Sequence, residues 1–231
     1  CNKQTKHIST PYIVDILNLH AFSGLLHTKL DGAVLLEGEV EKKEKLKVTG
    51  LTKSLGGEIN YQLIDNNLTS SIESVPVNNM LNMFRFPAFV DANASGQLGY
   101  DTREKKGETQ LTLKDFKLAS NKVTKNIKSM ALNDPASIVF GQSSLDVKID
   151  RDNIHYILMA KVDNASITVD EAIINKEVDS HNAKIVFAHD KYKIQGHIDG
   201  SIRNPRIDFN TKDIEDLDFM AKLEREVKKI L

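Results

Sequence analysis

The chain has 231 residues, 40% of them hydrophobic and 27% charged, so it can bury a sizeable core and is neither a disordered tail nor a low-complexity sequence. Its 31 basic and 32 acidic residues leave a net charge of −1, which argues against a nucleic-acid-binding protein, since phosphate contacts need a basic surplus or a basic face. One cysteine excludes an intrachain disulfide and a cysteine-based zinc site, and no apolar run approaches the roughly 20 residues of a membrane-spanning helix.

The first predicted helix in chain order is a short one. Apolar residues recur at helical spacing between Pro76 and Pro87, which predicts a helix over residues 77–85. The same spacing predicts a second short helix over residues 122–131 and a longer one from about Asp213 to the C-terminus. The last of these has acidic residues in its first turns and basic residues near its end, as the helix dipole favours.

Around these helices, apolar and polar residues alternate, which is the pattern of β-strands. Turn-forming sequences separate the alternating runs at intervals of about 10 residues, as in a meander. Each run has one apolar and one charged face, so the pattern predicts an antiparallel sheet that faces water on one side only. The clearest alternating sets are Leu98 and Tyr100; Leu111 and Leu113; Val147 and Ile149; Ile154, Tyr156 and Leu158; Ile167 and Val169; Ala183, Ile185 and Phe187; and Tyr192, Ile194 and Ile198.

The fold class that follows is mainly β: an elongated, twisted antiparallel sheet with a few short helices and a C-terminal helix. No clear linker divides the chain, so we expect one elongated domain over residues 1–231, with the weakest pattern in residues 1–21. About ten strands share one apolar face, but only three helices and few aromatic residues are there to cover it. Either the sheet folds over itself, or it curves into a groove whose apolar face stays open to a ligand or partner.

The histidines and carboxylates do not form a recognisable catalytic or metal site. His181, His189 and His197 recur every eight residues, but eight residues of extended strand span about 26 Å, so the first two cannot share a metal ion. The acidic run at residues 150–153 lacks the glycine and the distal glutamate of a calcium loop and is typical of a turn. We therefore expect a protein that is not an enzyme and that uses no metal or cofactor.

Two segments carry a resemblance to a known family. The first, residues 74–107, joins a Val-Pro-Val helix start to a Ser-Gly-x-x-Gly-Tyr-Asp strand and a Lys-Lys-Gly turn. The second, residues 194–207, repeats Gly-x-Ile and ends in Pro-x-Ile, and residues 22–40 fit the strands that precede both. Over residues 22–231 the chain resembles the C-terminal region of the AsmA-like family of diderm bacteria, which includes TamB and YhdP.

This resemblance implies a long curved β-sheet in the periplasm, tethered to the inner membrane by a segment outside this chain. The implied function is non-enzymatic: phospholipid binding and transport between the inner and outer membranes, contributing to outer-membrane biogenesis. The implied partners are phospholipid acyl chains, which would lie along the apolar inner face of a β-groove. The residues expected to line that groove are Leu98, Tyr100, Leu111, Leu113, Val147, Ile149, Tyr156, Leu158, Ile185 and Ile194.

Two points stay open. The sheet could instead be filled by its own side chains and serve as a structural or interaction module of an envelope assembly or secretion system, with an open strand edge that takes up a partner strand. The anchoring is also open, because the sequence starts at Cys1 rather than at Met. We expect either a fragment of a longer, membrane-anchored envelope protein or a mature lipoprotein acylated at Cys1.

Overall fold

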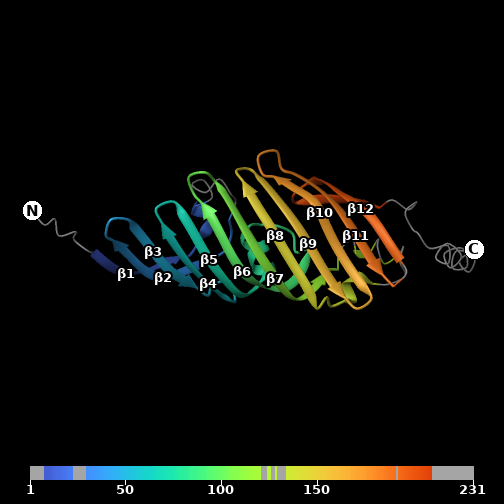
Figure 1. Cartoon of the computed structure of the whole chain (residues 1–231), viewed down its shortest axis with the longest axis horizontal. Helices are drawn as coiled ribbons and strands as arrows, with labels where there is room; N and C mark the ends of the chain where they lie inside the picture. Colours follow the sequence, from blue (N-terminus) through green and yellow to red (C-terminus); the bar gives the residue numbers. More distant parts are fainter. Residues whose placement is uncertain are drawn as a thin grey trace, which may run out of the picture.

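The computed structural model describes residues 8–22, 30–120, 124–125, 128, 134–190 and 192–209. These residues form one antiparallel sheet of thirteen strands, in which each strand pairs only with the strands next to it in the sequence. The strands lie side by side along the long axis of the molecule, with β1 and β12 near opposite ends in Figure 1. The sheet is open, because β1 and β13 each have a single partner. The prediction of a mainly β, antiparallel meander is confirmed.

Within the described residues, the strands are joined mostly by short turns and are interrupted by short helical segments. The strands are β1 (Ile8–Ile16), β2 (Val34–Lys42), β3 (Leu46–Thr52), β4 (Glu58–Ile64), β5 (Asn67–Pro76), β6 (Val90–Asp101), β7 (Lys106–Leu118), β8 (Gln142–Asp150), β9 (Asn153–Val162), β10 (Ala165–Asn175), β11 (Ser180–His189), β12 (Tyr192–Ser201) and β13 (Asn204–Phe209). The helical segments are η1 (Leu19–Phe22), α2 (Val77–Met83) and η2 (Pro135–Ser137).

The helix predicted over residues 77–85 is present as α2. It ends two residues earlier than predicted, because Arg85 takes a left-handed conformation with a φ of 59°. The amide of Arg85 donates to the carbonyl of Asn82 at 3.0 Å, and the next amide donates to the carbonyl of Leu81 at 2.8 Å. This pair of bonds is a Schellman motif, which satisfies the last carbonyl groups of the helix. The Arg85 guanidinium forms a salt bridge with Asp31, with 3.2 Å between Nη2 and Oδ2.

The other two predicted helices fall mostly or wholly outside the described residues. Of residues 122–131, only residues 124, 125 and 128 are described, and these are helical. The C-terminal helix predicted from about Asp213 lies outside the described residues altogether.

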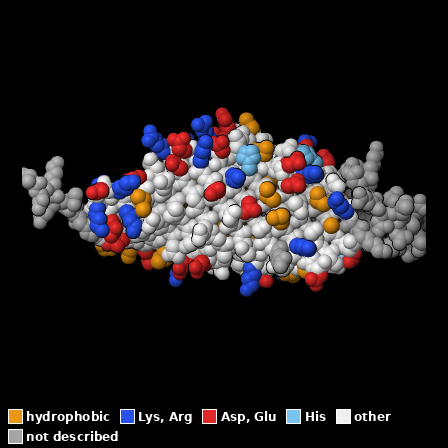
Figure 2. Space-filling model, viewed as in Figure 1, with side chains coloured by type: hydrophobic (Ala, Val, Ile, Leu, Met, Phe, Trp, Pro, Cys, Tyr) orange, Lys and Arg blue, Asp and Glu red, His pale blue; other side chains and the backbone are white. Residues whose placement is uncertain are grey.

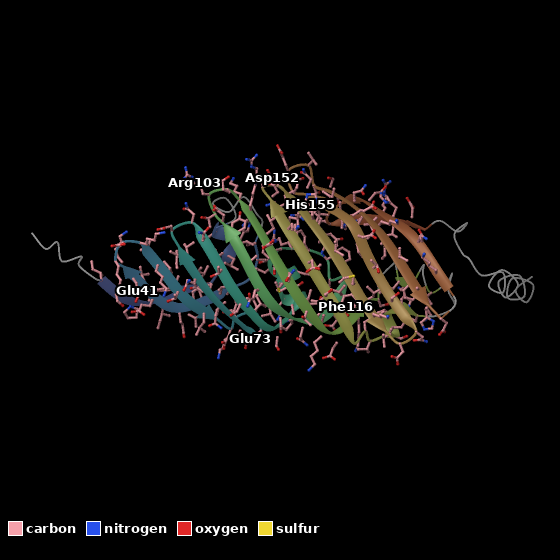
Figure 3. All side chains as sticks on the ribbon, viewed as in Figure 1. Glu41, Glu73, Arg103, Phe116, Asp152 and His155 are labelled. Atoms are coloured by element: carbon pink, nitrogen blue, oxygen red, sulfur yellow. The ribbon has the colours of Figure 1, made fainter. Side chains whose placement is uncertain are left out.

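The two faces of the sheet differ in composition. On one, which we call the apolar face, directly opposed residues form cross-strand rows of hydrophobic side chains. One such row, from β4 to β11, consists of Ile59, Ile72, Gly96, Leu111, Leu145, Leu158, Val169 and Ile185. The other, the polar face, includes His155 and is turned toward the viewer in Figure 3.

Two connecting segments cover part of the apolar face. Helix α2 lies against β5 and β6, and its residues Val77 and Met80 pack on the hydrophobic core. The connection between β7 and β8 places Phe140 edge-on against Phe116, with ring centroids 5.8 Å apart and both side chains fully buried. The main core is built from residues of β5–β12, with Val77, Met80 and Phe140 of these covering segments packed against it.

Three strands carry an extra residue at a β-bulge. The register shifts between Ile72 and Val75 in β5, between Asp91 and Asn93 in the pairing of β6 with β7, and between Val169 and Ala172 in β10. A non-glycine residue with a positive φ lies in each bulged strand: Ser74 at 49°, Asp115 at 56° and Glu171 at 50°. Such bulges bend the strand and increase its twist. They also let residues three apart, such as Val169 and Ala172, both reach the core.

Candidate functional site

The residues predicted to line a groove all lie on the apolar face. Their strands place them in adjacent cross-strand rows, because opposed residues in an antiparallel pair share a face and residues two apart along a strand do so as well. Leu111 and Leu158 share the row described above; Leu98, Val147 and Tyr156 lie in the next row; and Tyr100 and Ile149 lie in the one beyond.

Burial divides these residues into two groups. Leu111, Leu113, Ile185 and Ile194 are 7%, 2%, 6% and 1% exposed, and they belong to the main hydrophobic core. Contacts within the protein already fill this part of the apolar face. The remaining predicted residues are only half-buried: Leu98, Tyr100, Val147, Ile149, Tyr156 and Leu158.

A row of half-buried hydrophobic residues crosses nine strands, from β2 to β10. We call it the apolar row, and it consists of Val40, Val48, Leu63, Leu68, Tyr100, Gly107, Ile149, Ile154 and Ile174. All of these residues are partly exposed. At about 4.8 Å between neighbouring strands, the row spans roughly 38 Å along the molecule. The Tyr100 ring bridges its one glycine, since a Cβ on Gly107 would lie 2.7 Å from Tyr100 Cδ2.

The neighbouring row, which we call the tyrosine row, consists of Tyr12, Gly38, Gly50, Tyr61, Ser70, Leu98, Thr109, Val147, Tyr156 and Ala172. Tyr12 and Tyr61 lie over the opposed pair Gly38 and Gly50, with their hydroxyl groups 2.6 Å apart. The Tyr12 hydroxyl donates to the Thr49 carbonyl at 3.1 Å. Burial and the neighbouring tyrosine raise the pKa of Tyr61, so the phenol stays neutral.

At its other end, the tyrosine row reaches a tyrosine–histidine pair. The Tyr156 hydroxyl lies 2.8 Å from Nε2 of His181, the residue that follows Ile174 in the apolar row. Burial raises the pKa of Tyr156 and lowers the pKa of His181, so both groups favour their neutral forms. The two rows contain no Asp, Glu, Lys or Arg, and they form a continuous uncharged surface.

Sequence reasoning missed the N-terminal half of this surface. Val40, Val48, Leu63 and Leu68 belong to it, yet the clearest alternating sets begin only at Leu98. Their alternation is the signal that could have found them, and the glycines at positions 38 and 50 interrupt it. The proposed lipidation residue, Cys1, lies outside the described residues.

No family model matches the chain, and neither do the curated proteins or the solved structures that were compared with it. Within the described residues, no helix is both long and apolar enough to cross a membrane. The same part of the chain contains no group of three or more His, Cys, Asp or Glu side chains placed to hold a metal ion. What the fold defines is an open, single-sheet antiparallel meander whose apolar face carries two adjacent uncharged rows, the apolar row and the tyrosine row.

Proposed function

We propose that the protein is a non-enzymatic lipid-binding protein whose apolar face takes up phospholipid acyl chains. The observation that carries this proposal is the apolar row, in which partly exposed hydrophobic side chains follow one another across nine strands. Transfer of a methylene group from water to such a surface contributes about 0.8 kcal/mol when it is fully buried. Because the adjacent tyrosine row is also uncharged, an acyl chain lying there desolvates no ionised group.

The length of the row supports movement as well as binding. The hydrocarbon core of a bilayer is about 30 Å thick, so one acyl chain spans about 15 Å of it. At roughly 38 Å, the row is more than twice as long as one chain. A bound chain can therefore shift along the row while exchanging one set of hydrophobic contacts for an equivalent one.

The cellular setting of this proposal rests on the AsmA-like resemblance. In that setting the sheet lies in the periplasm and contributes to phospholipid movement between the inner and outer membranes, and so to outer-membrane biogenesis. Its tether is a membrane segment outside this chain or an acyl group on Cys1.

A second candidate function is that of a structural or interaction module of an envelope assembly, with a core filled by its own side chains. The burial of Leu113, Ile185 and Ile194 favours it. So does the open edge strand β1, in which Ile13 is 74% exposed, because an edge strand can pair with a partner strand.

Titration with a phosphatidylglycerol that carries a fluorescent acyl chain tests the lipid proposal. The wild type should bind it, and Leu68→Asp should weaken binding at least about tenfold, because the carboxylate would have to be desolvated against the chain. The matched control is Thr69→Asp, one residue away on the polar face, which should bind lipid like the wild type.

Melting curves of both variants separate loss of binding from loss of fold. A folded wild type that binds no phospholipid would overturn the lipid proposal and leave the interaction module as the better explanation. Leu113 cannot serve in this test, since at 2% exposure a charge there would destabilise the core whatever the function.

A further inference from the structure

The polar face of the sheet is hollowed over β2–β7. The hollow has a volume of about 990 Å³ and is lined by two complete cross-strand rows, with Gly38, Gly50, Tyr61, Ser70, Leu98 and Thr109 of the tyrosine row between them. One row is Glu37, Leu51, Asn60, Ser71, Gln97 and Gln110. The other is Glu39, Thr49, Gln62, Thr69, Gly99 and Glu108. We call this region the polar hollow; it lies on the opposite side of the sheet from the apolar row.

The floor of the polar hollow is uncharged. Every residue that β3–β6 contribute to the two rows is neutral, and carboxylates appear only where the rows end, on β2 and β7. Charged residues on the same face stand at the ends of the strands, at Lys47, Glu58, Glu73, Asp101 and Lys106. In the left half of Figure 2, most charges lie at the edges of this face and the surface between them is mostly white. A surface that serves only solubility intersperses charges of both signs instead.

Several polar side chains on the floor of the polar hollow have hydrogen-bonding groups that are not used within the described residues. Within the described part of the chain, the side-chain amides of Gln62, Gln97 and Gln110 make no hydrogen bond. Asn60 uses one donor on Glu58, at 2.9 Å. Each amide can donate twice and accept twice, and the hydroxyls of Thr49 and Ser71 can do both as well. Such groups match a ligand that presents many hydroxyl groups, each of them also a donor and an acceptor.

We propose that the polar hollow binds a neutral glycan that lies across β2–β7. Neighbouring strands are about 4.8 Å apart, so an extended chain of sugar rings meets a new amide or hydroxyl at each strand. Leu51 offers an apolar contact for the C–H face of a ring. Glu37, Glu39 and Glu108 accept hydrogen bonds from sugar hydroxyls at the two ends and repel anionic ligands.

Calorimetric titration with maltohexaose, cellohexaose and chitohexaose tests this proposal, with a sulfated hexasaccharide as the anionic comparison. At least one neutral probe should bind with a Kd below about 1 mM, and the sulfated probe should not. Gln97→Ala combined with Gln110→Ala should weaken that binding at least about tenfold without changing the melting temperature, since both side chains are exposed. Gln195→Ala, an amide on the same face but on β12, is the matched control and should bind like the wild type.

Several results would overturn the glycan proposal. Failure of all three neutral probes to bind overturns the proposal, and so does binding that the double variant leaves unchanged. If sedimentation shows a dimer that the double variant dissociates, the hollow is a contact between two copies of the chain and not a glycan site. Thr69→Asp should weaken glycan binding while sparing lipid binding, which keeps the two faces experimentally separate.

Discussion

Gly50 has no room for a side chain on the apolar face. A Cβ there would lie 2.5 Å from the Tyr61 hydroxyl and 2.6 Å from the carbonyl oxygen of Glu37, whereas a Cβ on Gly99 would meet nothing within 4 Å. We expect Gly50→Ala to lower the free energy of unfolding by about 1–3 kcal/mol, because the backbone of a neighbouring strand would have to move. Gly99→Ala should leave it unchanged or raise it slightly. Urea denaturation measures both, and equal stabilities would contradict the account of the tyrosine row.

His181 should make stability depend on pH. Burial lowers its pKa from 6.5 in the folded protein, so below pH 6.5 the unfolded chain binds more protons than the folded one. Its neutral form therefore favours the folded state at pH 7 and above. That contribution should shrink as the pH falls below 6.5 and level off once the pH passes the lowered pKa.

Chemical denaturation at intervals between pH 7.5 and about 5 checks this expectation. His181→Gln should flatten the decline, while His155→Gln, at an exposed position on the polar face, should keep it. If the free energy of unfolding of His181→Gln still declines as the pH falls, a group other than His181 causes the decline.

Among the elements, the bulge in β10 offers the sharpest test. Glu171 is exposed and has a φ of 50°, a conformation that costs a non-glycine residue about 1 kcal/mol. Glu171→Gly should therefore leave the free energy of unfolding unchanged or raise it by up to about 1 kcal/mol, since relief of the positive φ offsets the entropic cost of a glycine in a strand. Glu108→Gly, at an exposed position of β7 with an ordinary φ, should lower it by about 0.5–1 kcal/mol. The same sign for both would exclude backbone strain as the cause.

These bulges also mark what the sequence could and could not predict. Strict alternation over Ile185 and Phe187, or over Val147 and Ile149, predicts strands and their apolar face correctly. Alternation cannot reveal an extra residue such as Glu171, which puts Val169 and Ala172 on one face although they are three apart. Alternation predicts even less about burial, because the burial of a residue on the apolar face depends on where the β7–β8 connection folds back over the sheet.

The end of α2 is another feature that the sequence pattern does not predict. The apolar spacing predicts the helix. Its end depends on Arg85 adopting a left-handed conformation, and a glycine at that position would have made the end predictable. Contact with Asp31, which lies 54 residues earlier, accompanies that conformation. Local pattern predicts the element, and a distant partner helps to set its boundary.

Across the whole molecule, buried side chains are unevenly distributed. The main core spans β5–β12, whereas β2, β3 and β4 contribute mostly half-buried residues. We expect their backbone amides to exchange with deuterium sooner than those of β7, β10 and β11, because local opening there exposes less buried apolar surface. Hydrogen exchange followed by mass spectrometry measures this, and uniform protection across the sheet would show that the strands unfold as a single unit.

The unbroken meander has a consequence for how such a protein can evolve. Among the strands that the structure describes, none is inserted between two others out of order, so duplication of one hairpin lengthens the sheet without rethreading the chain. Each added hairpin would extend every cross-strand row by about 9.6 Å. The length of the sheet then increases in proportion to the number of duplicated hairpins.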